Sequence, residues 1–260
     1  MTRIVVGILV VWSSALMASA EPTMVGLARR DVTPSFPVRL SGYNNRSSEA
    51  SDVEQRLWAK ALAIGSDADG PAILVTVDNL GVPATMTAEI ASRLAASHGI
   101  RPERFAICAS HTHCGPVLIG VAPLIVRDAK PEELRHIEQY TADLAAAIEQ
   151  VAVAALADRK PGMLSWATGE VKFAANRRVL KQGAWAGFGT APAGPVDHRL
   201  PTLRVTDADG KLRGVLVNYA CHCTTLGGDF NRIGGDWAGY AQEFIERDHP
   251  GTVAMVAIGC

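Results

Sequence analysis

The segment Ala109–Pro116 contains two histidines close together, and histidine is a residue type that can bind metal or transfer protons. The apolar run 105–109 predicts a buried strand, and the Gly-Pro pair at 115–116 ends it, so His111 and His113 lie where a strand opens into a loop. In an extended chain, residues i and i+2 point to the same side. The two imidazoles can therefore face one spot, as a metal site or an acid/base site requires.

A third histidine, His222, ends another β-rich run, residues 214–222, just before a glycine-rich loop. Histidines at the ends of separate strands are one way in which a fold assembles a zinc site. A catalytic zinc takes three protein ligands and leaves a fourth position open. The spacing fits equally well with buried histidines that serve only the core, so both interpretations stay open at this point.

Two further polar positions stand beside predicted strands. Asp78 directly follows the strand 73–77, at the carboxyl end where site residues gather in α/β folds. A turn or capping role explains it equally well. The pair Arg177-Arg178 lies between two strand-like stretches, and an arginine there can orient a substrate oxygen, although a surface pair is the default interpretation.

Near the end of the chain, residues 237–247 predict a helix. Asp236 is placed to act as its N-cap, which competes with a catalytic role. We expect Glu243 and Glu246 to lie on the solvated face of this helix.

The remaining pattern predicts a layered α/β fold. Expected strands cover residues 24–31, 56–64, 73–77, 105–109 and 252–258, and expected helices cover residues 84–97 and 131–157. A strand, a helix and a strand in succession imply a parallel pair. We therefore expect a mixed, largely parallel sheet flanked by helices. No shift in composition marks a border, so residues 21–260 are expected to form a single domain, itself incomplete.

Composition excludes some classes of protein. The 260 residues are 48% hydrophobic, which is ample for a core, and 25 Lys+Arg nearly balance 26 Asp+Glu. The sequence shows no basic cluster, so a nucleic-acid partner is not expected. Chemistry on a small molecule or a lipid fits better.

Residues 1–20 form a segment of a different kind. Arg3 gives a positive start, residues 4–11 are apolar, and Ala18-Ser19-Ala20 is a small-residue cleavage site. This pattern predicts a signal peptide cut after Ala20 and a secreted or periplasmic protein.

The chain has five cysteines. We interpret Cys108, Cys114, Cys221 and Cys223 as buried thiols. A disulfide between Cys108 and Cys221 and thiolate ligation of zinc are the alternatives. The odd number alone does not decide between them.

Three segments together carry a resemblance to a known family. Residues 109–116, 218–225 and 235–240 resemble the amino-terminal catalytic domain of the neutral/alkaline non-lysosomal ceramidases. The order of smaller elements agrees, at Gly42-Tyr43, 55–61, 76–78 and Asn176-Arg177. The likeness runs from about residue 24 to the end, and its most specific element is His-Thr-His-x-Gly-Pro.

This resemblance implies a zinc amidase that splits the N-acyl bond of ceramide into a sphingoid base and a fatty acid. By position in the motifs, His111 and His222 look like Zn²⁺ ligands. His113 looks like the adjacent catalytic histidine, and Arg177 looks like the arginine near the scissile amide. A lipid substrate also favours transient contact with a membrane surface, although the sequence shows no amphipathic anchor.

The chain departs from the family pattern in two respects. Cys114 and Cys223 stand where the family often has a serine and a proline. The family's other zinc ligands, a glutamate and a tyrosine, and its active-site serine are expected downstream of Cys260. We therefore expect the sequence to be the front part of a longer one, and these 260 residues alone to be inactive or to bind metal weakly.

Two alternative functions compete with this interpretation. One is a zinc hydrolase of the same fold that acts on another amide or on an ester. The other is a secreted binding domain without catalysis, in which the histidines belong to the core. Metal content separates the second alternative from both enzymes.

Overall fold

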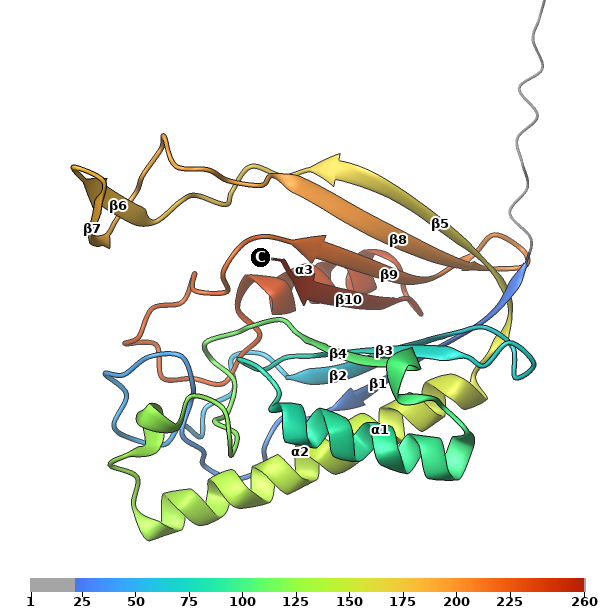
Figure 1. Cartoon of the computed structure of the whole chain (residues 1–260), viewed down its shortest axis with the longest axis horizontal. Coiled ribbons are helices and arrows are strands. Elements are labelled where there is room, and N and C mark those ends of the chain that lie inside the picture. The colour runs from blue at the N-terminus through green and yellow to red at the C-terminus, as the bar shows by residue number, and fades with distance from the viewer. Residues whose placement is uncertain (1–21, 260) are drawn as a thin grey trace, which may run out of the picture.

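An eight-stranded sheet with three α-helices forms the molecule in the computed structural model, which describes residues 22–259 (Figure 1). The predicted signal peptide, residues 1–20, lies outside the described residues. The sheet order is β10-β9-β8-β5-β1-β2-β3-β4. Its strands are β1 (Thr23–Asp31), β2 (Trp58–Ile64), β3 (Ala72–Val77), β4 (Phe105–Ala109), β5 (Lys160–Glu170), β8 (Arg199–Asp207), β9 (Leu212–Tyr219) and β10 (Val253–Ile258). The helices are α1 (Ala84–His98), α2 (Pro131–Ala157) and α3 (Asp236–Asp248).

The predicted α/β fold with a mixed sheet flanked by helices is confirmed, but the expectation that the sheet is largely parallel is wrong. Among the described strands of this sheet, β3 pairs with β4 and β10 pairs with β9 in parallel, and the other neighbours are antiparallel. A parallel pair needs a long crossover, and only α1 and α3 supply one between consecutive paired strands. Short turns at residues 65–71 and 208–211 force the antiparallel hairpins β2–β3 and β8–β9 instead.

The sheet curls until its two ends meet. β10, at one edge, contacts β3 and β4 at the other edge. An apolar cluster fills the space between the two halves, consisting of Val25, Leu27, Leu62, Val205 and Met255. This curl brings the carboxyl end of β9 beside the carboxyl end of β4, although the strands are far apart in the sheet order.

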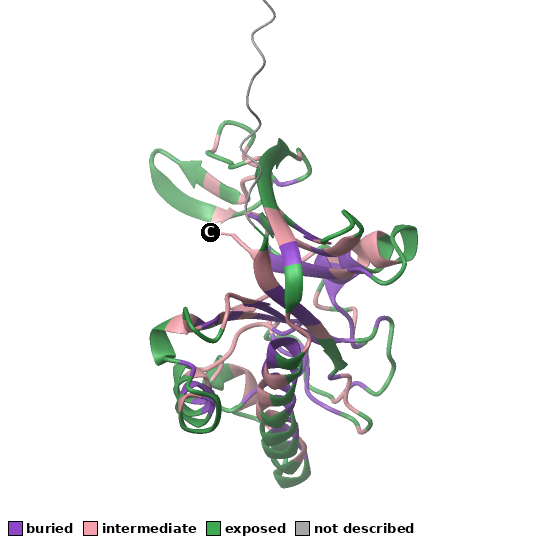
Figure 2. Cartoon of the chain, turned by 90° about the vertical axis from the view of Figure 1, so that its right-hand side faces the viewer, coloured by how far each residue is buried: buried purple, intermediate pink, exposed green. Residues whose placement is uncertain are grey.

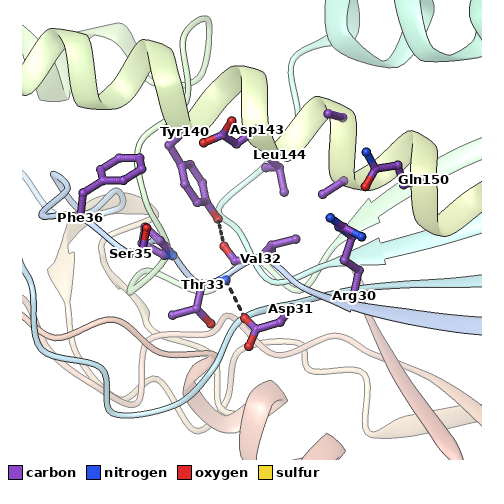
Figure 3. Close-up of a pocket in the computed structure, with 13 residues that line it drawn as sticks. Arg30, Asp31, Val32, Thr33, Ser35, Phe36, Tyr140, Asp143, Leu144 and Gln150 are labelled. Carbon is purple, nitrogen blue, oxygen red and sulfur yellow. Dashed lines mark hydrogen bonds between the residues drawn. The ribbon is translucent and has the colours of Figure 1, made fainter.

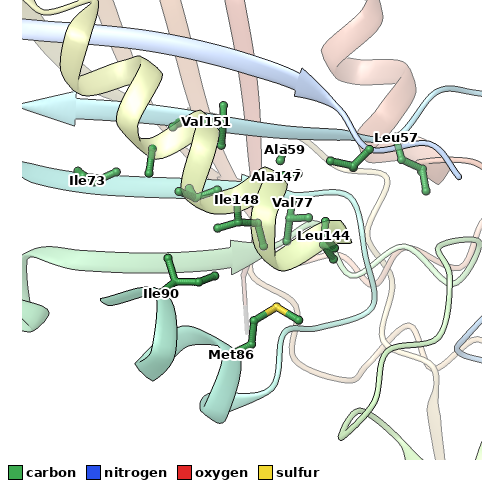
Figure 4. Close-up of a cluster of buried hydrophobic side chains, with 14 of the residues drawn as sticks. Leu57, Ala59, Ile73, Val77, Met86, Ile90, Leu144, Ala147, Ile148 and Val151 are labelled. Atoms are coloured by element: carbon green, nitrogen blue, oxygen red, sulfur yellow. The ribbon is translucent and has the colours of Figure 1, made fainter. Parts of the chain in front are cut away.

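Helices α1 and α2 cover the outer face of β1–β4. Figure 4 shows Ile90 of α1 and Leu144, Ile148 and Val151 of α2 directed at these strands, and all four are buried. Figure 2 shows that buried residues concentrate in the strands at the centre, whereas the outward surfaces of the helices are exposed. By length and composition α2 could cross a membrane, but its apolar face forms the core. Burial of this face accounts for the helical pattern in the sequence.

A buried charge cluster joins α3 to the sheet. The ammonium of Lys60, on β2, is 1% exposed and donates to Glu246 Oε1 at 2.7 Å and to the Ala254 carbonyl at 2.8 Å. Burial lowers the pKa of Lys60, and the nearby Asp78 and Glu246 oppose that shift. The expectation that Glu246 lies on a solvated face is therefore wrong, because its carboxylate pairs with the sheet. Glu243 is exposed, as expected.

Replacing Lys60 by methionine is expected to lower the free energy of unfolding by about 3 kcal/mol, because breaking a buried pair leaves uncompensated carboxylates. Chemical denaturation measures the change. The matched control is Arg56→Ala, since Arg56 is 67% exposed in its pair with Asp31 and should change stability by less than about 1 kcal/mol. Equal effects of the two substitutions would contradict the structural role of Lys60.

A small separate hairpin completes the fold. Strands β6 (Arg178–Lys181) and β7 (Ala184–Phe188) pair with each other and form a two-stranded sheet of their own. This hairpin projects from the body beyond the ends of β5 and β8 (Figure 1). Its connections run back to β5 and β8 through residues 171–177 and 189–198.

Candidate metal and catalytic site

The structure brings the three histidines together. His111 and His113 follow β4 and His222 follows β9, and one ligand atom from each lies within 4.8 Å of the others. The Nε2 atoms of His113 and His222 are 2.8 Å apart. The rings of His111 and His222 have their centroids 4.5 Å apart. The curl of the sheet makes this cluster, because it joins the ends of β4 and β9.

A backbone carbonyl fixes the orientation of the His111 imidazole. Its Nδ1 lies 2.5 Å from the Leu80 carbonyl oxygen, which can only accept, so Nδ1 carries the proton. The Nε2 lone pair is then free, which is the arrangement typical of a histidine that binds metal. The backbone of His111 has φ +59°, a left-handed conformation that is uncommon outside glycine. Strain of this kind clusters at functional sites.

His113 lies deeper, with its ring packed against the loop 42–46. The Tyr43 ring meets the imidazole edge-on at 4.9 Å between centroids. Gly42 has φ +92° and no room for a side chain, since a Cβ there would lie 2.3 Å from Cγ of His113. His113 Nδ1 is buried and has no hydrogen-bond partner among the described residues.

Arg46 is a residue that the sequence did not mark as part of the site. Its buried guanidinium donates to the backbone carbonyl of His113, to that of Ser41 at 2.8 Å and to that of Phe230 at 2.8 Å. It therefore ties the histidine loop to two other loops. The only signal in the sequence was its place in an ordered polar loop with Gly42 and Tyr43.

Arg177 lines the same open pocket as His111 and His222, which has a volume of about 580 Å³. Its Nη1 donates to Thr224 Oγ1 at 3.3 Å, two residues beyond His222. Arg177 is half-buried and lines this pocket beside His222.

The surroundings of His113 and His222 favour the neutral form of both imidazoles. Burial, together with the neighbouring His222 and His111, lowers the pKa of His113 to about 3. Burial, followed by the positive charge of Arg177, lowers the pKa of His222 to about 4. Neutral imidazole is the form that binds metal. Three imidazoles with ring nitrogens close together, one of them with an orphaned buried nitrogen, fit a divalent transition metal.

Residues 23–257 match the family described as "Neutral/alkaline non-lysosomal ceramidase, N-terminal". The chain belongs to this family. It is 24% identical over 249 residues to a neutral ceramidase of Pseudomonas aeruginosa, a match that covers 93% of this chain and 36% of that protein. It is 26% identical over 248 residues to a neutral ceramidase of Oryza sativa subsp. japonica, covering 92% of this chain and 30% of that protein. The chain therefore spans about a third of the length of these relatives.

Solved structures agree with the fold. The crystal structure of neutral ceramidase from Pseudomonas aeruginosa matches with a TM-score of 0.75 at 25% identity, over 92% of this chain and 39% of that one. A structure described as "Ceramidase complexed with C2" matches with a TM-score of 0.73 at 22% identity, over 92% of this chain and 38% of that one. The family resemblance seen in the sequence is thus confirmed.

In this ceramidase-family chain, two carboxylates near the site are structural. Asp78 accepts from Trp58 N and Gln242 Nε2, both at 3.0 Å, and burial raises its pKa against the effect of Lys60. Asp236 is the first residue of α3 rather than its N-cap, which is Gly235. Its carboxylate accepts from the backbone of Thr225 and Leu226 and so holds the loop that follows His222.

The cysteines of the motifs are free thiols. Cys108 and Cys221 are half-buried, and Cys114 and Cys223 are buried. Burial raises the pKa of all four thiols, so the protonated form is favoured at neutral pH. The structure thus gives no support to either alternative, a Cys108–Cys221 disulfide or thiolate ligation.

A second pocket lies away from the histidines, between the end of β1 and α2 (Figure 3). Its volume is about 320 Å³. Tyr140 Oη donates to the Val32 carbonyl at 2.9 Å, and Thr33 N donates to Asp31 Oδ1 at 2.9 Å. None of the three clustered histidines lines this pocket.

Substituting Gly42 by alanine is expected to displace the His113 ring and to lower by about a hundredfold any reaction rate that depends on the position of that ring, since misplacement by about 1 Å has effects of that size. Steady-state kinetics measures this. Gly70→Ala is the matched control: Gly70 also has positive φ, +70°, but a Cβ there meets nothing within 4 Å. Both changes strain the backbone, so comparable losses of activity would show that contact with His113 is not the cause.

Proposed function

We propose that the protein is a zinc-dependent amidohydrolase that cleaves the N-acyl bond of ceramide-type lipids into a sphingoid base and a fatty acid. The observation that carries this proposal is the cluster of three imidazoles beside Arg177, in a chain of the ceramidase family. His111 and His222, which both line the open pocket, would hold zinc through their ring nitrogens. Zinc, when bound, supplies Lewis-acid polarisation of a carbonyl and lowers the pKa of water to near neutral.

The chain's own residues position the substrate and move the proton. Arg177 has a fixed positive charge at the pocket wall, so its guanidinium binds and orients an oxygen of the substrate. Water adds its oxygen to the carbonyl carbon, and the bond from that carbon to nitrogen breaks. His113, at Nε2, holds a proton released by the water and donates it to the departing amine. The atoms of one water molecule are thereby divided between the fatty acid and the base.

An apolar hollow next to the pocket supports a lipid substrate. Phe173, Leu226, Trp237 and Phe244 line it, and its volume is about 520 Å³. Thr224 lines the histidine pocket, and the next residue in the chain, Thr225, lines the hollow, so the two are neighbours. A hydrocarbon chain gains free energy by leaving water for such a surface.

Two further parts of the proposal rest on sequence. Residues 21–260 are the amino-terminal part of a ceramidase-like catalytic domain. The pattern of residues 1–20, with its small-residue cleavage site at Ala18–Ala20, supports export to the periplasm or the medium.

The test is hydrolysis of an N-acyl sphingosine with a short acyl chain, with both products quantified, by the 260-residue chain and by any longer form that its gene encodes. Chelation should abolish hydrolysis and added zinc should restore it. Arg177→Ala should lower kcat/KM by about a hundredfold, whereas Arg93→Ala, an exposed arginine of α1, should not. Cleavage of simple esters or other amides with no cleavage of ceramide would contradict the substrate, and activity insensitive to chelation would contradict the metal.

A further inference from the structure

The projecting β6–β7 hairpin exposes large apolar side chains to solvent. Leu180, Trp185 and Phe188 are 60%, 63% and 70% exposed. Between residues 173 and 196 the charged residues are Arg177, Arg178 and Lys181, all of them basic. A two-stranded hairpin is marginally stable on its own. Such a combination of aromatic and cationic side chains is typical of surfaces that meet lipid headgroups.

The register places the apolar side chains on one face of the hairpin. Leu180 pairs directly with Trp185, and Arg178 pairs with Phe188. Residues three apart in a strand normally point to opposite faces, but a bulge opposite Val179/Leu180 inserts one residue between Trp185 and Phe188. Their ring centroids are consequently 6.0 Å apart. The guanidinium of Arg178 lies over the Phe188 ring at 4.8 Å.

The base of the same hairpin forms a wall of the histidine pocket. Residues 174–178, which lead into β6, and residues 195–197, which return from β7, both line that pocket together with His222. Anything that binds the hairpin therefore lies beside the pocket opening.

We propose that the β6–β7 hairpin docks on the surface of a phospholipid bilayer, with Leu180, Trp185 and Phe188 at the interface and Arg178 and Lys181 toward the headgroups. The proposal rests on the proposed function in one respect, since a ceramide-type substrate resides in a bilayer. The positive charge of Arg178 and Lys181 on the hairpin itself favours an anionic lipid surface over an apolar protein segment. Docking there presents the pocket to the membrane.

Sedimentation with vesicles tests the docking. The purified chain is expected to bind vesicles of phosphatidylcholine mixed with phosphatidylglycerol more tightly than vesicles of phosphatidylcholine alone. The double variant L180S/W185S should lower the partition coefficient by roughly tenfold or more, because it removes two apolar anchors. Lys181→Glu should lower binding to the anionic vesicles by at least about fivefold.

The matched control is Trp166→Ser, since Trp166 is 83% exposed but lies on β5 in the main sheet. It should leave vesicle binding unchanged. Trp185→Phe should keep vesicle binding while removing most of the fluorescence quenching by brominated lipid. Unchanged binding in L180S/W185S, or an equal loss in Trp166→Ser, would overturn the proposal, as would a hairpin covered by another polypeptide in a longer form of the protein.

Hydrolysis of a water-soluble ceramide analogue separates this proposal from the proposed function. L180S/W185S should hydrolyse the soluble analogue as the wild type does and lose activity only on ceramide in vesicles. Vesicle binding that depends on the hairpin, without hydrolysis of either substrate, would sustain the docking and refute the enzyme. Hydrolysis of both substrates by L180S/W185S at wild-type rates would refute the docking alone.

Discussion

In a form of the protein that contains the complete zinc site, alanine in place of His111 or His222 is expected to reduce bound zinc from about one per chain to none and to lower hydrolysis by at least about a thousandfold. Each substitution removes one convergent imidazole, and a metal site with a ligand missing loses the several kcal/mol of charge stabilisation that the metal contributes. Elemental analysis of the purified chain measures the zinc, and steady-state kinetics measures the loss of activity.

The control for both variants is His136→Ala. His136 is a partly exposed histidine on α2 that is bonded to Glu49 at 2.7 Å and lies outside the cluster. It should retain full zinc content. If the His111 and His222 variants fold and keep their zinc, these imidazoles do not bind the metal and serve only to pack the core.

His113→Ala is expected to separate catalysis from metal binding. With His111 and His222 as the ligands, zinc content should persist while kcat falls by about a hundredfold to ten-thousandfold, the range for loss of a general acid or base. The reason is the position of His113, whose Nε2 faces the site at 2.8 Å from His222 Nε2 and whose ring is held by Gly42 and Tyr43.

Zinc analysis and kinetics on the same preparation decide the matter, with the melting temperature measured to show that the variant folds. If zinc is lost together with activity, His113 is the third ligand, and the assignment of a proton-transfer role to it is wrong.

Local patterns predicted the individual elements well. The apolar run 105–109 and the amphipathic stretch 131–157 became β4 and α2 with the bounds expected. Helix α2 is buried along the face that its periodicity indicates. The expectation of a buried strand at 105–109 is wrong, because β4 lies at an edge of the sheet: Phe105 is buried, Ala106 is exposed and the other three residues are half-buried. The placement of His111 and His113 at the end of β4 follows from the same local signal.

Contacts between distant segments were not predictable in this way. The meeting of His113 with His222 depends on the curl of the sheet, which depends in turn on strand order and on antiparallel pairings that no local pattern specifies. Glu246 reads as an ordinary surface charge and nothing local marks Arg46, because their partners are a lysine and a backbone carbonyl far away in the chain.

The faces of the β6–β7 hairpin could not be predicted from a local pattern either, although the segment is short. A strand with period two would put Trp185 and Phe188 on opposite faces, so the sequence shows no apolar anchor. The bulge reverses that inference, because it inserts one residue between the two aromatic positions.

Anomalous diffraction at the zinc absorption edge, from crystals of the purified chain or of any longer form that its gene encodes, tests the central claim most directly. The account predicts one strong peak in the pocket, with distances of about 2.0–2.1 Å to the Nε2 atoms of His111 and His222. No peak at the histidines in zinc-replete crystals, or a peak at the thiols of Cys221 or Cys223 instead, would contradict it.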